Sequence, residues 1–307
     1  MDFPTGSSER FLRNALTIDV EDYFQVTAFD GVVDRKDWAI YPSRVENNTR
    51  RVMALLDEFG IKGTFFVLGW VAERFPLMVR EMADNGHEVA CHGYGHELVY
   101  NMTPESFRAD VRLAKNILEN ITGRPVLGYR APSYSIVERS LWALDVLVEE
   151  GFVYDSSIFP IHHDNYGIPG AQRFPYDIER SAGTIREFPL TTLSIPMPGK
   201  NLALPIAGGG YLRLLPVGVI HWGMRHINAK DKQPTVLYFH PWEVDPDQPR
   251  IKARLKSRFR HYVNLETTED KIRTLLTGLE FDTMANVLGL NGDGSENGDD
   301  RIQEVLK

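Results

Sequence analysis

The stretch LTIDVEDYFQV, residues 16–26, runs from an apolar, strand-like segment straight into three carboxylates. Asp19, Glu21 and Asp22 fall within four positions, and aromatic residues resume directly after them. Burying a carboxylate without a partner is costly. The stretch is therefore either a surface turn or the point where a buried strand enters a functional site.

Outward from this stretch, segments typical of strands alternate with segments typical of helices. The predicted strands are 15–20, 63–69, 87–92, 126–132, 152–157, 185–193 and 235–243, and the predicted helices are 43–59, 70–84, one beginning at 103–104, 138–150, 217–228, 250–260 and 268–277. Ser43 and Glu46 predict a capping box at the first helix. The segments 158–184 and 196–216 are predicted as loops.

This alternation is typical of a parallel α/β fold. Six or seven units favour a closed or nearly closed (β/α) barrel with a helical C-terminal extension. An open doubly wound sheet is the alternative that periodicity alone leaves open.

The composition is globular, with 307 residues, 43% hydrophobic, 25% charged and a formal charge of −8. No basic stripe stands out, so nucleic acid is not an expected partner. The single cysteine excludes an internal disulfide and suits a reducing compartment. No apolar run approaches the roughly 20 residues of a membrane span, and the first residues lack a signal-peptide core. We therefore expect a cytoplasmic protein without a membrane span.

Polar residues recur where the predicted strands end. They are Asp19, His92 with the nearby His96, Arg130, Asp155 and His240. The carboxyl ends of parallel strands are where active sites of barrels and open α/β sheets are built. The sequence therefore predicts that these side chains converge on one site.

His92 and His96 are four residues apart in CHGYGHE, and a tight turn could bring both imidazoles together. Two imidazoles and one carboxylate make a facial site with open positions, as in zinc and non-haem iron centres. The alternative is a pair of histidines in an exposed loop. The acidic cluster at another strand end favours the metal site.

The other strand-end residues have equally simple alternatives. Arg130 could hold a carboxylate bidentately or lie solvated in a turn. Asp155 could cap a turn or helix. His240, in LYFHPWE, could be a core histidine, but beside a metal and an aspartate it becomes a candidate general acid.

Five segments in order, ALTIDVED, HEVACHGYGHE, GYRAPSYS, YDSSIFP and LYFHPWE, resemble the motifs of NodB-homology polysaccharide deacetylases, carbohydrate esterase family 4. The resemblance covers roughly 15–243 and implies a distorted (β/α) barrel of about seven strands. It implies N-deacetylation of an acetylated amino-sugar oligo- or polysaccharide with a divalent metal, for which Zn²⁺ is expected.

A subfamily encoded beside exopolysaccharide and exosortase loci is resembled more specifically. The resemblance rests on the segments DVEDYF, FHPWE and GGGYLRLLP and on the helical C-terminus. We expect one catalytic domain over 1–290, with its motifs in 15–243 and a helical extension over 244–290. The polar, acidic segment 291–307 is predicted to be a disordered tail.

The resemblance implies a role for each matching residue. These are the base Asp19, the arginine that orients it (Arg130), the metal ligands His92 and His96, the general acid His240, the aspartate that tunes it (Asp155), and an oxyanion-hole N–H near Ser133. Candidate substrate contacts are Ser133, Tyr134, Tyr166 and Trp242.

One position departs from the family pattern. Val20 stands where the family has a second aspartate, so the carboxylate ligand must be Glu21 or Asp22. In a strand, Glu21 shares the face of Asp19 and Asp22 lies on the opposite face. The departure also admits a metal-independent variant, as in the related allantoinase-like branch.

Two other functions remain as alternatives. One is a C–N hydrolase of a small cyclic amide or ureide on the same barrel, and the other is a catalytically degenerate sugar-binding protein. The sequence leaves the oligomeric state open.

Overall fold

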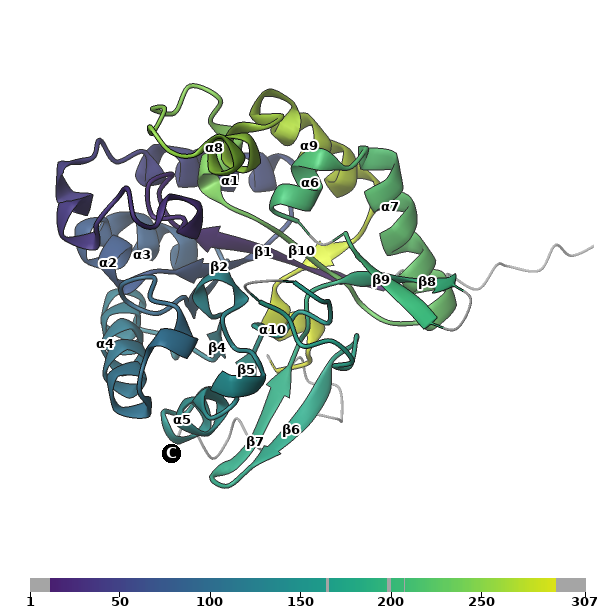
Figure 1. Cartoon of the computed structure of the whole chain (residues 1–307), viewed down its shortest axis with the longest axis horizontal. Coiled ribbons are helices and arrows are strands. Elements are labelled where there is room, and N and C mark those ends of the chain that lie inside the picture. Colours follow the sequence, from purple (N-terminus) through teal and green to yellow (C-terminus); the bar gives the residue numbers. More distant parts are fainter. Residues whose placement is uncertain (1–11, 164–165, 198–199, 207, 291–307) are drawn as a thin grey trace, which may run out of the picture.

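The computed structural model describes residues 12–163, 166–197, 200–206 and 208–290. Within them, parallel strands form the wall of a distorted barrel (Figure 1). In spatial order these strands are β10 (Val236–Phe239), β1 (Asn14–Val20), β2 (Thr64–Val67), β3 (Glu88–Cys91), β4 (Gly128–Tyr129), β5 (Tyr154–Asp155) and β7 (Gly183–Glu187). The predicted barrel of about seven strands is therefore confirmed. The short β11 (Phe281–Asp282) pairs in parallel with the first two residues of β1, Asn14 and Ala15.

The sheet runs from β10 to β7 and continues into the antiparallel β6 (Tyr176–Arg180). β10 and β7 lie toward opposite ends of this sheet. Side-chain and backbone contacts from the segment after β7 connect it to β10. The Thr191 hydroxyl donates to the Val236 carbonyl at 3.0 Å and accepts from the Val236 N–H at 2.6 Å. Gly208 forms a bridge with Tyr238, where a Cβ would lie 1.7 Å from the Tyr238 carbonyl oxygen. Only glycine fits this closure.

Helices surround the barrel in Figure 1, with α2, α3 and α4 along one side and α6, α7 and α9 along another. Their bounds are α1 (Val45–Glu58), α2 (Gly69–Arg74), α3 (Pro76–Asp84), α4 (Pro104–Thr122), α5 (Ala143–Glu149), α6 (Gly210–Leu214), α7 (Val217–His226), α8 (Leu255–Tyr262), α9 (Thr268–Gly278) and α10 (Met284–Val287). No helix of the described chain is long and apolar enough to cross a bilayer.

Side chains along each strand alternate between two hydrophobic cores, one shared with the surrounding helices and one inside the barrel. Phe65 and Val67 of β2 pack outward with the helices, while Phe66 between them belongs to the cluster that fills the barrel. Ile18 and Val20 of β1 likewise pack outward. The same two-residue period turns Asp19 toward the barrel interior.

Several predicted boundaries are wrong. The predicted helix 70–84 is divided into α2 and α3 because Pro76 starts a new helix after Phe75. The predicted loop 158–184 contains β6, and the predicted loop 196–216 contains α6 and most of a hairpin. That hairpin is formed by β8 (Thr192–Met197) and β9 (Lys200–Pro205). The predicted tail 291–307 lies outside the described residues.

The N-terminus of α1 is capped from a distance, and the predicted capping box is absent. One oxygen of Asp22 accepts from the Ser43 hydroxyl at 2.6 Å, the Arg44 N–H at 2.9 Å and the Val45 N–H at 3.2 Å. Glu46 instead pairs with Arg50. The carboxylate that follows β1 thus satisfies the open N–H groups of the next helix.

Candidate active site

Five of the six predicted strand-end residues converge, and Asp155 is the exception. Asp19 lies near the end of β1 and Glu21 just after it, while His92, Arg130 and His240 directly follow β3, β4 and β10. Because these strands are parallel neighbours, their carboxyl ends meet at one edge of the barrel. Asp19, Glu21, His92 and Arg130 are buried there, so each of these charged or polar side chains depends on its neighbours inside the protein for hydrogen bonds and charge partners.

Arg130 holds Asp19 through a single carboxylate oxygen. Its Nη1 donates to Asp19 Oδ1 at 2.7 Å and to the Thr17 hydroxyl at 2.8 Å. The Nε and Nη2 groups donate to the carbonyl and hydroxyl of Ser156. The expected bidentate grip is therefore wrong, because Ser156 occupies the other donors. Asp19 Oδ2 is left facing His240 Nε2 at 3.9 Å.

Glu21, His92 and His96 form a cluster of candidate metal ligands. One ligand atom from each lies within 4.8 Å of the others. The Nδ1 of His92 donates to the Arg130 carbonyl at 2.8 Å, so the lone pair of its other nitrogen is available to a cation. Burial lowers the pKa of His92 to about 4, which keeps the imidazole neutral.

The carboxylate of this cluster, Glu21, is also suited to bind a metal ion. Glu21 Oε2 lies 2.8 Å from His96 Nε2, and no other group of the described chain bonds to this buried oxygen. Burial would raise the pKa of Glu21, but the charges of His96 and His240 outweigh it and lower the pKa to about 2. These residues fit a divalent cation. Asp22 is not a member of the cluster, because its oxygens cap α1 and bind the Tyr23 N–H.

A tight glycine turn brings the two histidines together, as the spacing suggested. Gly93 has φ +75°, which favours glycine. Asp110 of α4 accepts from the Tyr94 N–H at 2.8 Å and the Gly95 N–H at 3.4 Å. His96 itself has φ +52°, a strained conformation for a non-glycine residue. Asp110 was missed by the sequence reasoning because its partners are backbone groups 15 and 16 residues away.

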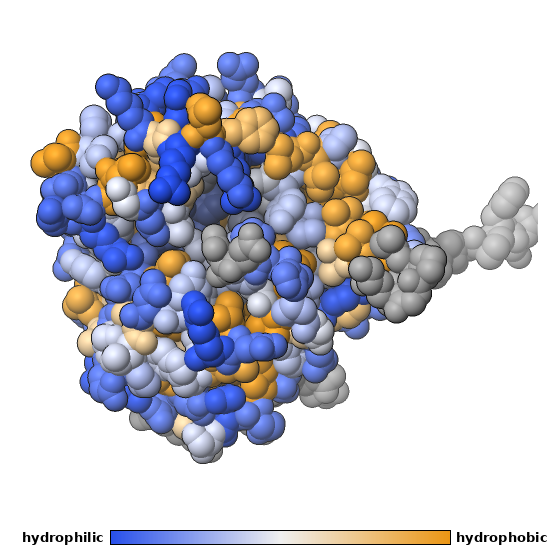
Figure 2. Space-filling view, viewed as in Figure 1, coloured by the Kyte–Doolittle hydropathy of each residue, from blue (hydrophilic) through white to orange (hydrophobic). Residues whose placement is uncertain are grey.

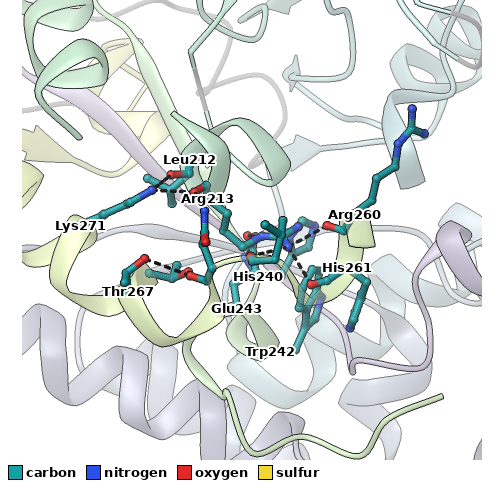
Figure 3. Close-up of polar contacts among 12 residues, drawn as sticks. Leu212, Arg213, His240, Trp242, Glu243, Arg260, His261, Thr267 and Lys271 are labelled. Carbon is teal, nitrogen blue, oxygen red and sulfur yellow. Dashed lines mark hydrogen bonds and ion pairs between the residues drawn. The ribbon is translucent and has the colours of Figure 1, made fainter. Parts of the chain in front are cut away.

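Glu243 holds His240 in place (Figure 3). Its Oε1 accepts from His240 Nδ1 at 2.7 Å and from the His240 backbone N–H at 3.0 Å. The Nε2 of His240 then lies 3.4 Å from Glu21 Oε1. Burial would lower the pKa of His240, but the surrounding Glu21, Glu243 and Asp19 carboxylates raise it to about 9.

The role expected for Asp155 must be corrected, since Glu243 is the carboxylate on His240. Asp155 Oδ1 accepts from the Ser157 hydroxyl at 2.6 Å. Asp155 is also the register partner of Glu187 on the neighbouring strand β7. The signal for Glu243 was the His-x-x-Glu spacing in HPWE, typical of a capped helical turn.

Asp155 and Glu187 form a buried carboxyl pair. Asp155 Oδ2 and Glu187 Oε2 have no other hydrogen-bond partner in the described chain. Burial raises the pKa of both groups, and the Asp155 charge holds the pKa of Glu187 well above its ordinary value. We expect the two neighbouring carboxyl groups to share one proton.

Arg213 of α6 completes the support of His240. Its Nε donates to Glu243 at 2.6 Å, and its Nη1 donates to the carbonyls of Arg260 and His261 at 2.8 and 2.7 Å (Figure 3). Arg213 is 4% exposed, so the pair with Glu243 is desolvated. Sequence reasoning missed it, because an arginine in a Leu-rich segment carries no local sign of its partner.

Trp242 packs against the imidazole of His240. Its ring stacks on His240 at 5.1 Å and on His261 at 4.1 Å between centroids. Its Nε1 lies 3.4 Å from Glu21 Oε1. Trp242 therefore fixes the plane of His240.

A groove of about 810 Å³ opens over these residues, and Figure 2 shows this face hollowed beneath α8. Asp19 and His240 line it, and so do the four predicted substrate contacts: Ser133, Tyr134, Tyr166 and Trp242. Ser133 and Tyr134 have φ +50° and +54°, so the backbone after Arg130 is strained where it faces the groove.

The chain matches two family models. Residues 30–147 match the model described as "Polysaccharide deacetylase", and residues 156–289 match a "Domain of unknown function (DUF3473)". The first range contains His92, His96 and Arg130. The second contains Arg213, His240 and Glu243, so the candidate site draws on both ranges.

Curated relatives are similar over less than half of the chain. A peptidoglycan deacetylase-like protein of Gibberella zeae is 32% identical over 139 residues, covering 44% of this chain and 40% of the relative. A peptidoglycan deacetylase of Helicobacter pylori is 31% identical over 114 residues, covering 37% of each. The chain thus spans about two fifths of the length of these relatives.

Solved structures share the fold across nearly the whole chain. A putative polysaccharide deacetylase from Mycobacterium smegmatis is 21% identical with a TM-score of 0.61, covering 94% of this chain and 91% of that one. A probable polysaccharide deacetylase from Pseudomonas aeruginosa is 14% identical with a TM-score of 0.57, covering 90% and 89%.

The choice between Glu21 and Asp22 is testable by metal content. Glu21→Gln is expected to lower bound zinc measured by ICP-MS at least tenfold after equilibration with limiting Zn²⁺, because a neutral amide replaces the charged ligand. Asp22→Asn is the matched control. It is expected to keep the metal and to lose about 1 kcal/mol of stability through the weakened cap. Equal zinc in wild type and Glu21→Gln would contradict the assignment.

The carboxyl pair predicts a pH dependence of stability. Folding raises the pKa of both Asp155 and Glu187. Their contribution to the free energy of unfolding is therefore fully present below their unfolded-state pKa values, and it is lost as the pH rises through their folded-state pKa values. Glu187→Gln cannot ionise and still donates to Asp155. Thermal melts from pH 5 to 8 should therefore show wild type losing stability relative to Glu187→Gln. Glu179→Gln, an exposed carboxylate on β6, should follow wild type; parallel curves for all three would refute the shared proton.

Proposed function

We propose that this chain, a member of the NodB-homology polysaccharide deacetylases, is a metal-dependent hydrolase. It removes N-acetyl groups from the amino sugars of a polysaccharide or its precursor and releases acetate. The supporting observation is that Asp19 and His240 face the ligand cluster Glu21, His92 and His96 within one groove. A base, an acid and a cation site on one wall suit hydrolysis of an amide.

The metal dependence rests on the ligand set. Glu21, His92 and His96 would hold the cation, and two imidazoles with one carboxylate suit Zn²⁺. When bound, the cation supplies Lewis acidity that activates water and the acetamide carbonyl. The presence of all three ligands favours this reading over the metal-independent, allantoinase-like alternative.

Asp19 is the base in this proposal. Arg130 fixes its Oδ1 at 2.7 Å, which leaves Oδ2 turned into the groove to accept a proton from the attacking water. Thr17 and Ser156 restrain the guanidinium, so the carboxylate cannot rotate away. This pre-positioning lowers the reorganisation that the proton transfer requires.

His240 is the acid. Glu243 takes the hydrogen bond of Nδ1–H, so the proton on Nε2 points toward Asp19 and Glu21 and can pass to the leaving amine. The carboxylates that raise the pKa of His240 to about 9 keep this proton in place at neutral pH. Proton donation to nitrogen then releases a free amino sugar and acetate.

The substrate class is proposed from the groove and the relatives. Tyr166 and Trp242 give the groove aromatic walls, which suit pyranose rings. The curated relatives include a chitooligosaccharide deacetylase and peptidoglycan deacetylases. The presence of Asp19, His240 and the ligand cluster in one groove argues against the degenerate sugar-binding alternative. The link to exopolysaccharide loci and the cytoplasmic location stay predictions.

Acetate release tests the proposal. The zinc-loaded chain should release acetate from N-acetylated chito-oligosaccharides or peptidoglycan fragments, and a chelator should abolish the release until zinc is restored. Asp19→Asn and His240→Ala should each lower kcat by about 10²–10⁴-fold, whereas Asp84→Asn on the surface of α3 should not. No acetate from any acetylated saccharide, or full turnover in both variants, would rule the proposal out.

The corrected role of Glu243 predicts a distinct pH profile. In Glu243→Gln the negative charge beside His240 is lost, so the pKa of His240 falls and the basic limb of the kcat profile moves to lower pH. Asp155→Asn is the comparison and should leave that limb nearly in place. Circular dichroism checks that both variants fold, because Glu243→Gln also leaves Arg213 without its charge partner. A larger displacement in Asp155→Asn would restore the original assignment.

A further inference from the structure

Residues 250–260 form a basic segment in an otherwise acidic chain. It holds six cations and no carboxylate: Arg250, Lys252, Arg254, Lys256, Arg258 and Arg260. All six are exposed. In the part of the chain that the structure describes, none of Lys252, Arg254, Lys256 and Arg258 forms an ion pair. The expectation that no basic stripe stands out is therefore wrong for this segment.

The outward face of α8 carries an apolar ridge between these cations. Leu255 and Phe259 are 81% and 61% exposed, and their spacing of four places them on one face. At 100° per residue, Arg258 lies on one flank of the ridge, and Lys256 with Arg260 lies on the other. The opposite face is anchored by the buried His261, which packs on Phe29 and Trp242.

This face continues into the mouth of the groove. Arg254, Lys256 and Arg260 line the groove, and so do Val32 and Leu214, each 49% exposed. Figure 2 shows hydrophilic side chains beside the hollow and apolar ones over α8. In Figure 3 the backbone carbonyl of Arg260 binds Arg213 while its side chain points away from the catalytic cluster.

We propose that the outward face of α8 docks on a membrane surface rich in anionic lipids and holds the groove mouth against it. The ridge of Leu255 and Phe259 would enter the headgroup boundary, and Lys256, Arg258 and Arg260 would pair with lipid phosphates. Two exposed apolar side chains flanked by cations suit a bilayer better than a dissolved polyanion, which would match the cations but leave the ridge in water.

The proposal goes beyond the hydrolytic function and is independent of it, because docking is measured without substrate. The full chain should co-sediment with vesicles of phosphatidylcholine and phosphatidylglycerol and not with phosphatidylcholine alone. Raising the ionic strength should release it, because exposed charges are screened by salt.

Two double variants separate the contributions. Lys256→Gln/Arg258→Gln should weaken the partition coefficient about 25-fold, since a cation at an anionic surface contributes about fivefold. Leu255→Ser/Phe259→Ser should weaken it at least as much. The matched control is Leu77→Ser/Arg80→Gln on α3, where Leu77 is 75% exposed, and it should bind like wild type. Thermal melts verify that all three fold.

Four results of the vesicle assays would overturn the proposal. They are no binding of wild type to the anionic vesicles, equal binding to the neutral ones, wild-type binding by both α8 variants, and an equal loss in the α3 control. Binding of a dissolved anionic polysaccharide without vesicle binding would assign the face to a saccharide. Self-association that Leu255→Ser/Phe259→Ser abolishes would assign it to a second copy of the chain. Both outcomes reject the membrane.

Discussion

The burial of Arg130 is the constraint on which the site depends. A guanidinium that is 0% exposed must satisfy its donors inside the protein. It does so on Asp19 and Thr17 of β1 and on Ser156 after β5, while its own carbonyl receives the Nδ1–H of His92. One residue thereby fixes the carboxylate of the proposed base and the tautomer of a proposed metal ligand.

A second buried arginine acts in the same way on the support of His240. Arg213 binds Glu243, which binds His240, whose Nε2 faces Glu21. Opposite charges alternate along this chain of contacts, so each desolvated charge has a partner. Arg213 also binds the Arg260 and His261 carbonyls of α8, which connects the support of His240 to the helix at the groove mouth.

A physical difference separates the predicted residues that the structure brings together from the one that it does not. Asp19, His92, Arg130 and His240 share one simple property, a place at the end of an apolar run, and parallel strands must bring such ends together. Asp155 has the same property, yet its side chain faces Glu187 because β5 pairs in register with β7. A position at a strand end therefore predicts that a residue lies at the carboxyl edge of the barrel. It does not predict which residue its side chain contacts there.

The sequence by itself determined a parallel α/β fold, the edge at which the site lies and the two histidines with a nearby carboxylate, because hydrophobic period and strand-end position are local properties. Periodicity left an open sheet possible, and closure into a barrel depends on tertiary contacts such as those of Thr191 with Val236. The choice of Glu21 over Asp22 was decided only in three dimensions, where the N-terminus of α1 draws Asp22 into a cap. The partnership of Arg213 with Glu243 also belongs to the tertiary structure. A buried charge selects its partner by distance and desolvation, and both depend on segments that are remote in the chain.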